Sequence, residues 1–279
     1  MNKTWLITGT SAGLGRVLTE RLLERNDRVV ATLRRDGPLD GMKARYGDRL
    51  HVLNVDLTDI ATIRAGVAEA FAVVGRIDAV VSNAAYGLVG AAEELEDEQI
   101  ARQIATNLTG SIQLIRAVLP YLRQQGGGRI VQVSSEGGQI AYPGFSLYHA
   151  TKWGIEGFIE SVAQEVAPFG IDFIIAEPGA TATNFGANIV MAPSIAAYEQ
   201  TPAGAVRRAI NEHTFTIKGD AGRTINALIA AVDSVKPPFR LALGSTAYLN
   251  IKRELARRLA EIESQREVAF SADQDAAGL

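Results

Sequence analysis

The sequence predicts an α/β fold: a Rossmann-type, doubly wound parallel sheet of seven strands in a single domain with a helical substrate lid. Three observations lead to this prediction. Short apolar runs alternate with helical patterns, the first run enters a glycine-rich turn, and the composition is that of a globular chain. The chain has 279 residues, 47% of them hydrophobic, and no cysteine. A chain of this length can bury a core without disulfides or a structural metal.

Seven apolar runs are predicted to be strands. They occupy residues 4–8, 28–33, 50–55, 77–82, 129–134, 171–177 and 240–243. Most are nearly continuous, as expected of strands buried on both faces. Apolar residues that recur at three and four predict helices over 14–25, 60–74, 99–124 and 147–166. This alternation predicts βαβ units with right-handed crossovers.

We assign residues 1–245 to one domain built on this Rossmann-type sheet, in which the alanine-rich insert 185–235 is expected to be the lid. Residues 246–279 are expected to form a C-terminal helix and a flexible tail, with 270–279 frayed. One apolar stripe of that helix consists of Ile251, Leu255, Leu259 and Ile262. The stripe predicts a surface helix or a subunit contact.

Charge and segment composition argue against several classes of protein. The net charge is −3 with interspersed signs, which favours neither nucleic acid nor an anionic membrane as a partner. No window approaches the roughly 18 apolar residues of a membrane span, and no signal peptide is recognisable. We expect a soluble, cytoplasmic protein whose partners are small molecules or its own copies. The three histidines are too dispersed to predict a metal site.

The first apolar run ends in a glycine-rich turn, Thr8-Gly9-Thr10-Ser11-Ala12-Gly13-Leu14-Gly15. Without side chains at Gly9 and Gly13, backbone N–H groups can reach a pyrophosphate, and the positive end of the next helix faces it. Gly15 lets helix and strand pack closely. Because such a turn alone is weak evidence, a plain βα connection remains the alternative.

A second feature is the pair Tyr148 and Lys152, which share one helix face because they are four residues apart. A nearby cation lowers the phenol pKa from its usual ~10 and so eases proton transfer. Ser135 follows a buried strand and can reach the same point from the carboxyl edge of the sheet. The alternatives are a solvated helix face for the pair and a plain loop for the serine.

Together these residues resemble the classical short-chain dehydrogenase/reductase family, from Thr4 to about Thr183. The stretch 82–85 departs from the family's Asn-Asn-Ala-Gly at Ser82 and Ala85. The resemblance implies the catalytic set Asn107, Ser135, Tyr148 and Lys152. It implies, with the two arginines discussed next, a cofactor site of Gly9, Thr10, Ser11, Gly13, Leu14, Gly15, Arg34, Arg35, Asp56, Leu57, Asn83, Ala84, Ala85, Tyr148, Lys152, Pro178, Gly179, Thr181 and Thr183.

Each catalytic residue has a role implied by the resemblance. Tyr148 would be the general acid and base, and Ser135 would hold the substrate oxygen. Lys152 would lower the pKa of Tyr148 and grip the nicotinamide ribose. Asn107 would hold a water that links Lys152 to solvent.

The end of the second strand predicts the cofactor. Leu33 stands where an NAD-binding carboxylate would be expected, and Arg34 and Arg35 follow it. A guanidinium suits a 2′-phosphate, so NADP(H) is preferred. NAD(H) is the less favoured alternative, because Asp36 is close and Ala12 is not basic.

The predicted function is an NADP(H)-dependent carbonyl reductase or secondary alcohol dehydrogenase, acting on a hydrophobic ketone or alcohol that the apolar insert would line. The alternative is a non-catalytic, NADP(H)-sensing binding protein on the same fold. The helices 99–124 and 147–166 carry surplus apolar residues and pair between subunits in the family. A homodimer or homotetramer is therefore expected.

Overall fold

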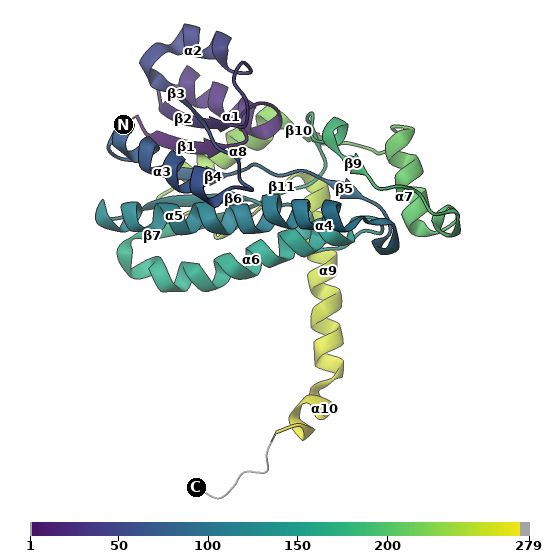
Figure 1. Cartoon of the computed structure of the whole chain (residues 1–279). Helices are drawn as coiled ribbons and strands as arrows, with labels where there is room; N and C mark the ends of the chain where they lie inside the picture. Colours follow the sequence, from purple (N-terminus) through teal and green to yellow (C-terminus); the bar gives the residue numbers. More distant parts are fainter. Residues whose placement is uncertain (1, 274–279) are drawn as a thin grey trace, which may run out of the picture.

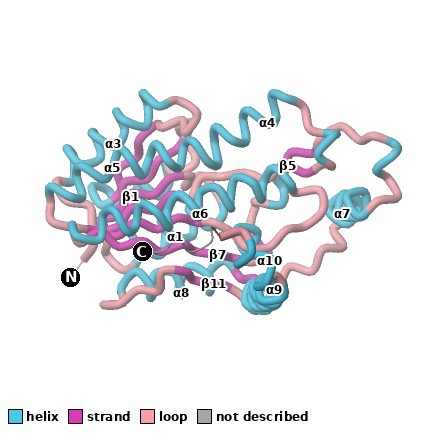
Figure 2. The backbone as a smooth tube through the Cα atoms, turned by 90° about the horizontal axis from the view of Figure 1, so that it is seen from below, coloured by secondary structure: helices cyan, strands magenta, loops and turns pink. Residues whose placement is uncertain are grey.

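The computed structural model describes residues 2–273 and consists of a parallel sheet between two layers of helices (Figures 1 and 2). The sheet order is β11-β7-β6-β4-β1-β2-β3, and all its neighbours pair in parallel. The seven strands are β1 (Thr4–Thr8), β2 (Arg28–Leu33), β3 (Leu50–Asn54), β4 (Ala79–Ser82), β6 (Gly128–Val133), β7 (Ile171–Pro178) and β11 (Arg240–Leu243). The predicted fold class is confirmed.

The chain reverses its direction of travel across the sheet between β1 and β4. It runs outward from β1 through β2 to β3 and then returns to β4 on the other side of β1. In open α/β sheets, ligands bind at such a switch point, outside the carboxyl ends of the strands. The topology therefore locates the site before any side chain is considered.

Two apolar clusters hold the helices on the two faces of the sheet. The first joins α3 (Ile60–Val74), α5 (Gly110–Gln124) and α6 (Ser146–Val166) to one face. The second joins α1 (Gly13–Glu24) and α8 (Ala221–Asp233) to the other. The short helix α2 (Asp40–Tyr46) adds the buried Met42 to the second cluster.

The predicted helix over 99–124 is interrupted. It begins earlier, with α4 (Asp97–Ile104), passes through a π-helical segment at Ala105–Thr109 and continues as α5. Single-turn π segments are frequent at functional sites, and apolar spacing carries no sign of them because the helical face is nearly preserved. The buried Asn107 lies in this segment.

The segment 185–235, expected to be the lid, divides into two parts. Its first part carries β9 (Val190–Met191), which pairs with β5 (Leu88–Val89), and α7 (Pro202–Asn211). Its last part is α8, whose buried Ile225, Leu228 and Val232 belong to the core. The apolar face of α8 packs against the sheet, so α8 is not part of a lid. Only residues 185–220 remain candidates for one.

The remaining elements complete the described chain. Two short strands, β8 (Thr181–Ala182) and β10 (Gly219–Asp220), pair beside the sheet. The C-terminal helices α9 (Ser245–Ser264) and α10 (Arg266–Ser271) leave the body (Figure 1). Most of the tail expected to fray, 274–279, lies outside the described residues. Within 2–273, no helix is long and apolar enough to cross a membrane.

Replacing Leu228 tests whether α8 is core. Leu228 is 2% exposed, so Leu228→Ala should lower the free energy of unfolding by about 2–5 kcal/mol through lost burial and a cavity. Val235→Ala, at a side chain that is 94% exposed, is the control and should change it by less than about 0.5 kcal/mol. Denaturant titration measures both. An equally small change in the free energy of unfolding for Leu228→Ala and Val235→Ala would show that α8 lies outside the core.

Candidate active site

The glycine loop lies at the switch point and is pinned there by Asn83. The Asn83 amide donates to the carbonyl oxygens of Thr8 (2.8 Å) and Gly9 (3.0 Å), while its own N–H donates to Thr8 Oγ1 (3.0 Å). A Cβ at Gly15 would lie 2.4 Å from the Gly9 oxygen, so only glycine fits there. Asn83 therefore acts here by fixing the loop that the sequence predicts to bind phosphate.

The start of α1 is open to an anion. Its N-cap, Ala12, has no side chain that could accept a hydrogen bond, and its first turn carries no acidic residue. The first backbone N–H groups of a helix lack partners within it and attract negative charge. Gly13 has φ +60°, and a Cβ there would meet only Thr183, at 3.8 Å. The donor set and the open cradle fit a dinucleotide pyrophosphate.

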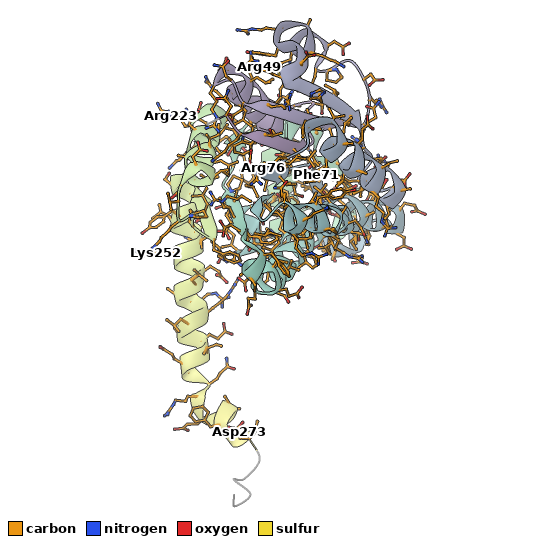
Figure 3. The ribbon with its side chains drawn as sticks, turned by 90° about the vertical axis from the view of Figure 1, so that its left-hand side faces the viewer. Arg49, Phe71, Arg76, Arg223, Lys252 and Asp273 are labelled. Carbon is orange, nitrogen blue, oxygen red and sulfur yellow. The ribbon has the colours of Figure 1, made fainter. Side chains whose placement is uncertain are left out.

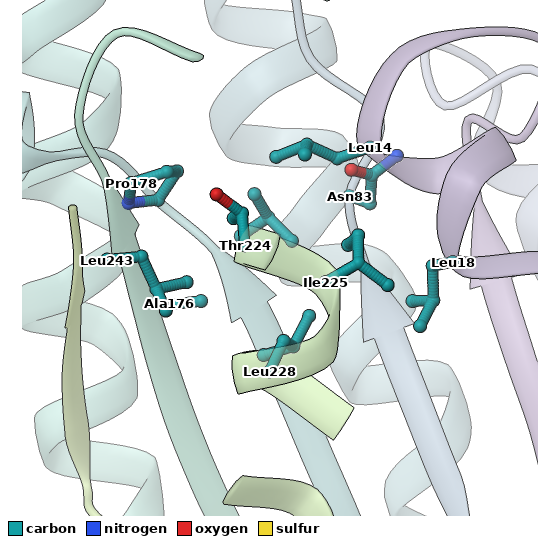
Figure 4. Close-up of a pocket in the computed structure, with 10 residues that line it drawn as sticks. Leu14, Leu18, Asn83, Ala176, Pro178, Thr224, Ile225, Leu228 and Leu243 are labelled. Carbon is teal, nitrogen blue, oxygen red and sulfur yellow. The ribbon is translucent and has the colours of Figure 1, made fainter. Parts of the chain in front are cut away.

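A small cavity below this cradle is visible in Figure 4. Its volume is about 10 Å³, about enough for one water molecule. Leu14 of the glycine loop, Asn83 and Pro178 meet around it, with Thr224 of α8 on the same wall. Its other lining residues, such as Leu18 and Ile225, belong to the core that α8 covers, so the cavity lies between the start of α1 and α8.

Tyr148 and Lys152 come from the first turns of α6, and Ser135 from the end of β6. Lys152 is 2% exposed; its Nζ donates to the Val133 oxygen (2.9 Å) and lies 5.6 Å from the centre of the Tyr148 ring. Ser135 Oγ accepts from the Gly137 N–H (3.0 Å), which leaves its own proton to donate. The structure brings these three predicted residues together.

The pKa of Tyr148 shifts in the direction opposite to the expected one. Burial raises it to about 12; a hydrogen bond with Ser135 opposes this rise and the Glu136 charge adds to it. Lys152 lies beside the ring and bonds a backbone carbonyl, and burial lowers its own pKa to about 8 against the opposing charge of Glu156. At neutral pH the phenol is therefore protonated.

Asn107 binds a residue that the sequence analysis missed. Its Oδ1 accepts from the Tyr86 N–H (3.1 Å), its Nδ2 donates to the Tyr86 oxygen (2.9 Å), and Nδ2 also lies 3.4 Å from Thr151 Oγ1. Asn107 thus ties the loop between β4 and β5 to the helix that carries Tyr148. The only signal for Tyr86 in the sequence is its position directly after residues 83–85.

The adenosine end of the predicted site is basic. Arg34 and Arg35 are exposed after β2. The pKa of Asp56 is lowered, first by the hydrogen bond from the Thr58 N–H and also by the charges of Arg34 and Arg102. Arg102 of α4 was not predicted, because nothing in the sequence relates α4 to β2 and β3. Arg34 and Arg102 thus contribute positive charge where Asp56-Leu57 is expected to meet the adenine.

Aromatic rings surround Tyr148 on the lid side. The ring centres of Phe185 and Phe145 lie 6.0 Å and 6.1 Å from that of Tyr148, both edge-on. The segment 185–220 is held by Glu94, whose buried carboxylate pairs with Arg207 (2.5 Å) and accepts from the Ile195 N–H (2.9 Å). Phe145 and Phe185 therefore give Tyr148 an apolar flank, while Ser135 and Lys152 supply its polar neighbours.

Comparison with known proteins decides the family. The profile of the short chain dehydrogenase family matches residues 3–193. The chain belongs to this family. It is a short-chain oxidoreductase, and members of the family use a nicotinamide cofactor. The match covers the glycine loop, Ser135, Tyr148 and Lys152, all of which lie at the switch point.

Relatives and solved structures of short-chain dehydrogenases agree with this assignment. Oxidoreductase BOA17 of Botryotinia fuckeliana is 34% identical over 265 residues, which cover 95% of each chain. A 3-ketodihydrosphingosine reductase of Bacteroides thetaiotaomicron is 31% identical over 86% of this chain and 87% of its own. The crystal structure of a short-chain dehydrogenase from Streptomyces avermitilis is 36% identical, with a TM-score of 0.91, and covers 98% of this chain and 100% of that one. Other solved structures that share the fold, at lower identity, hold NADP or NADH.

His149 supports the loop after Ser135. Its Nε2 accepts from the Tyr142 N–H (2.8 Å), and its Nδ1 lies 2.8 Å from the Gly137 oxygen. These two partners require the neutral ring with the proton on Nδ1. Burial lowers the pKa of His149 despite the opposing hydrogen bond to Gly137 and the charge of Glu136.

Protonation of His149 should therefore destabilise the fold in acid. With a folded-state pKa below the usual ~6.5, the unfolded chain binds the proton first, so this contribution is present above about pH 6.5 and is lost below it. Thermal unfolding from pH 7.5 to 5.5 measures the loss. His149→Gln should flatten the slope in that range, whereas the control His213→Gln, at an exposed position, should leave it unchanged. An unaltered slope in His149→Gln would contradict the assignment.

Proposed function

We propose that this oxidoreductase is an NADP(H)-dependent reductase of hydrophobic ketones, with Tyr148 as the proton donor. The observation that carries the proposal is the grouping of Ser135, Tyr148 and Lys152 at the carboxyl edge of the sheet, where Lys152 Nζ lies 5.6 Å from the centre of the Tyr148 ring. The nicotinamide, when bound, supplies the hydride. The chain itself must then polarise the substrate oxygen and protonate it.

The proposed role of each residue follows from the hydrogen bonds that its side chain can make. Ser135 Oγ accepts from the Gly137 N–H, and its own proton, which hydrogen-bonds with Tyr148 in this structure, would turn to the substrate oxygen, a contact that strengthens as negative charge develops there. Tyr148 donates its proton to the same oxygen. Lys152, a buried cation at neutral pH, stabilises the phenolate that remains.

The resupply of protons involves Asn107. Both polar atoms of its side chain are engaged by Tyr86, and its backbone oxygen accepts from Ser111 Oγ (3.1 Å). A carbonyl oxygen has a second lone pair. We propose that this lone pair holds the water that links Lys152 to solvent.

The pKa of Tyr148 also favours one direction. Reduction needs the protonated phenol, which is the form present at neutral pH. Oxidation needs the phenolate, which a pKa of about 12 makes scarce. The enzyme is therefore proposed to act as a reductase, with alcohol oxidation rising as the pH is raised.

The substrate class rests on Phe145 and Phe185, which flank Tyr148 edge-on, and on the apolar lid residues. The relative from Bacteroides thetaiotaomicron is named for a reductase of a 3-keto lipid, which is a hydrophobic ketone. A homodimer or homotetramer remains part of the proposal. A non-catalytic sensor of NADP(H) is less well supported, because it would not need Ser135 or Tyr148.

Removal of the Tyr148 hydroxyl tests the mechanism. Tyr148→Phe keeps the ring packed among Phe145 and Phe185, so cofactor affinity should stay within a few fold while ketone reduction is abolished. Ser135→Ala should lower the rate on the order of a hundredfold, the usual loss for one transition-state hydrogen bond. NADPH consumption with a panel of aliphatic and aryl ketones is the assay. Near-normal reduction by Tyr148→Phe would exclude the mechanism.

Cofactor choice is tested at Arg34 and Arg35. A charge-assisted contact with the 2′-phosphate is worth about 1.5–3 kcal/mol. The double variant Arg34→Ala with Arg35→Ala should therefore lower the affinity for NADPH roughly ten- to a hundred-and-fiftyfold and leave the affinity for NADH nearly unaffected. Adding Leu33→Asp should shift the preference toward NADH by supplying an acceptor for the ribose hydroxyl. Fluorescence titration measures both cofactors, with Arg116→Ala on the exposed face of α5 as the control. Equal weakening of the two cofactors would refute the NADP(H) assignment.

A further inference from the structure

The chain ends in a helical arm that projects from the body, defined here as residues 252–273 (Figures 1 and 3). Figure 3 labels Lys252 and Asp273 near its two ends. Just before the arm, the buried Ala247 and Ile251 anchor α9 by packing with Ile140. Every residue from 259 to 273 is exposed. The body of the chain therefore leaves the distal arm uncovered.

The arm carries an apolar stripe that nothing in its own chain covers. Leu255, Leu259 and Ile262 are 48%, 59% and 71% exposed. Their spacing of four and then three residues puts them on one side of the helix, as the seam of a two-helix coiled coil requires. Helical stability in proteins comes mostly from packing such a face, and a short helix standing alone in water is marginal.

The charges of the arm change sign along its length. Residues 252–258 carry four basic side chains against one acidic, and residues 259–267 carry three acidic against one basic. Two copies of the arm that run antiparallel bring the basic half of each against the acidic half of the other. A parallel pair would oppose like charges along its whole length.

The direction of the arm is fixed where it leaves the body. The Arg258 guanidinium stacks on Trp153, 4.4 Å from the ring centre, and donates to the Gln139 oxygen. Trp153, which stands exposed on α6, thereby acquires a packing partner. These contacts hold the stripe away from the body instead of letting it fold back.

We propose that the arm is a self-association surface, in which the stripe of one copy packs antiparallel against the same stripe of a second copy. Such an interface is isologous, so it closes with two-fold symmetry. A membrane surface fits less well, because the acidic half of the arm would be repelled by anionic lipid. The inference uses no residue of the proposed active site and is separate from any pairing of α5 and α6.

A charge placed on the stripe tests the proposal. Leu259→Glu should halve the mass of the assembly at micromolar concentration, measured by light scattering on the full chain. The matched control is Ala260→Glu, which adds the same charge one residue further on, at an exposed position off the stripe; it should leave the mass unchanged. Cofactor titration of both variants checks that the body remains folded.

Three outcomes of this experiment would overturn the proposal. The first is a monomeric wild type, and the second is an equal assembly mass for wild type and Leu259→Glu. The third is an equal loss of assembly mass in Leu259→Glu and in the control Ala260→Glu. Binding to vesicles of anionic phospholipid is measured as well. Binding to them by a wild type that stays monomeric would identify a membrane helix instead.

Cross-linking tests the orientation, because the chain has no cysteine of its own. In an antiparallel pair of α9 helices centred near Arg257, two copies of residue 252 lie about 15 Å apart, whereas 252 and 262 lie opposite each other. A mixture of Lys252→Cys and Ile262→Cys should therefore form a disulfide-linked dimer under mild oxidation. Lys252→Cys alone should not, since a disulfide needs Cα atoms within about 7 Å. Efficient linkage of Lys252→Cys to itself, or none in the mixture, would exclude the antiparallel pair.

Discussion

The rest of the site depends on the close approach of two loops at the switch point between β1 and β4. Asn83 holds them together through hydrogen bonds to Thr8 and Gly9, and a side chain at Gly9 would collide with Ala84 at 2.8 Å. Without that approach the N-terminus of α1 would not face the loop after β7. Ala85, where the family has glycine, lies beyond these contacts, so the departure leaves the tether intact.

A partly buried charge cluster positions α6, the helix that carries Tyr148 and Lys152, on the other side of the sheet. Arg240 of β11 binds Glu156 and Glu160 of α6 and Glu177 of β7, at 2.5–2.6 Å. Two buried carboxylates that share one guanidinium repel each other, and burial together with this repulsion raises the pKa of Glu177. Removing Arg240 would leave both uncompensated, which makes the cluster a constraint on where α6 can lie. Lys152 is one turn from Glu156, whose charge opposes the lowering of the Lys152 pKa, so the cluster and Lys152 are electrostatically linked.

Local patterns were enough to predict the seven strands and four of the helices that pack on them, α1, α3, α5 and α6. The run 4–8 and the helix 60–74 have the predicted bounds, because their apolar spacing reports directly on burial. The π segment at Ala105–Thr109 and the core role of α8 could not be predicted in this way. The π segment changes the backbone hydrogen bonding but hardly changes the spacing of the apolar residues. The core role of α8 depends on which face of the sheet the other helices leave uncovered. Ser135, Tyr148 and Lys152 were predicted as a group from the resemblance to the family and from the position of Ser135 at the carboxyl edge of the sheet.

The pKa of Tyr148 illustrates what sequence spacing leaves out. Four residues on a helix put Lys152 and Tyr148 on one face, but they do not determine which atom the ammonium meets. Here it bonds the Val133 oxygen, and burial then acts on both groups, raising one pKa to about 12 and lowering the other to about 8. Each shift favours the neutral form, as expected where water is excluded. Both shifts keep the proton on the phenol, and in the function proposed above this is the proton that a ketone would take as it accepts hydride.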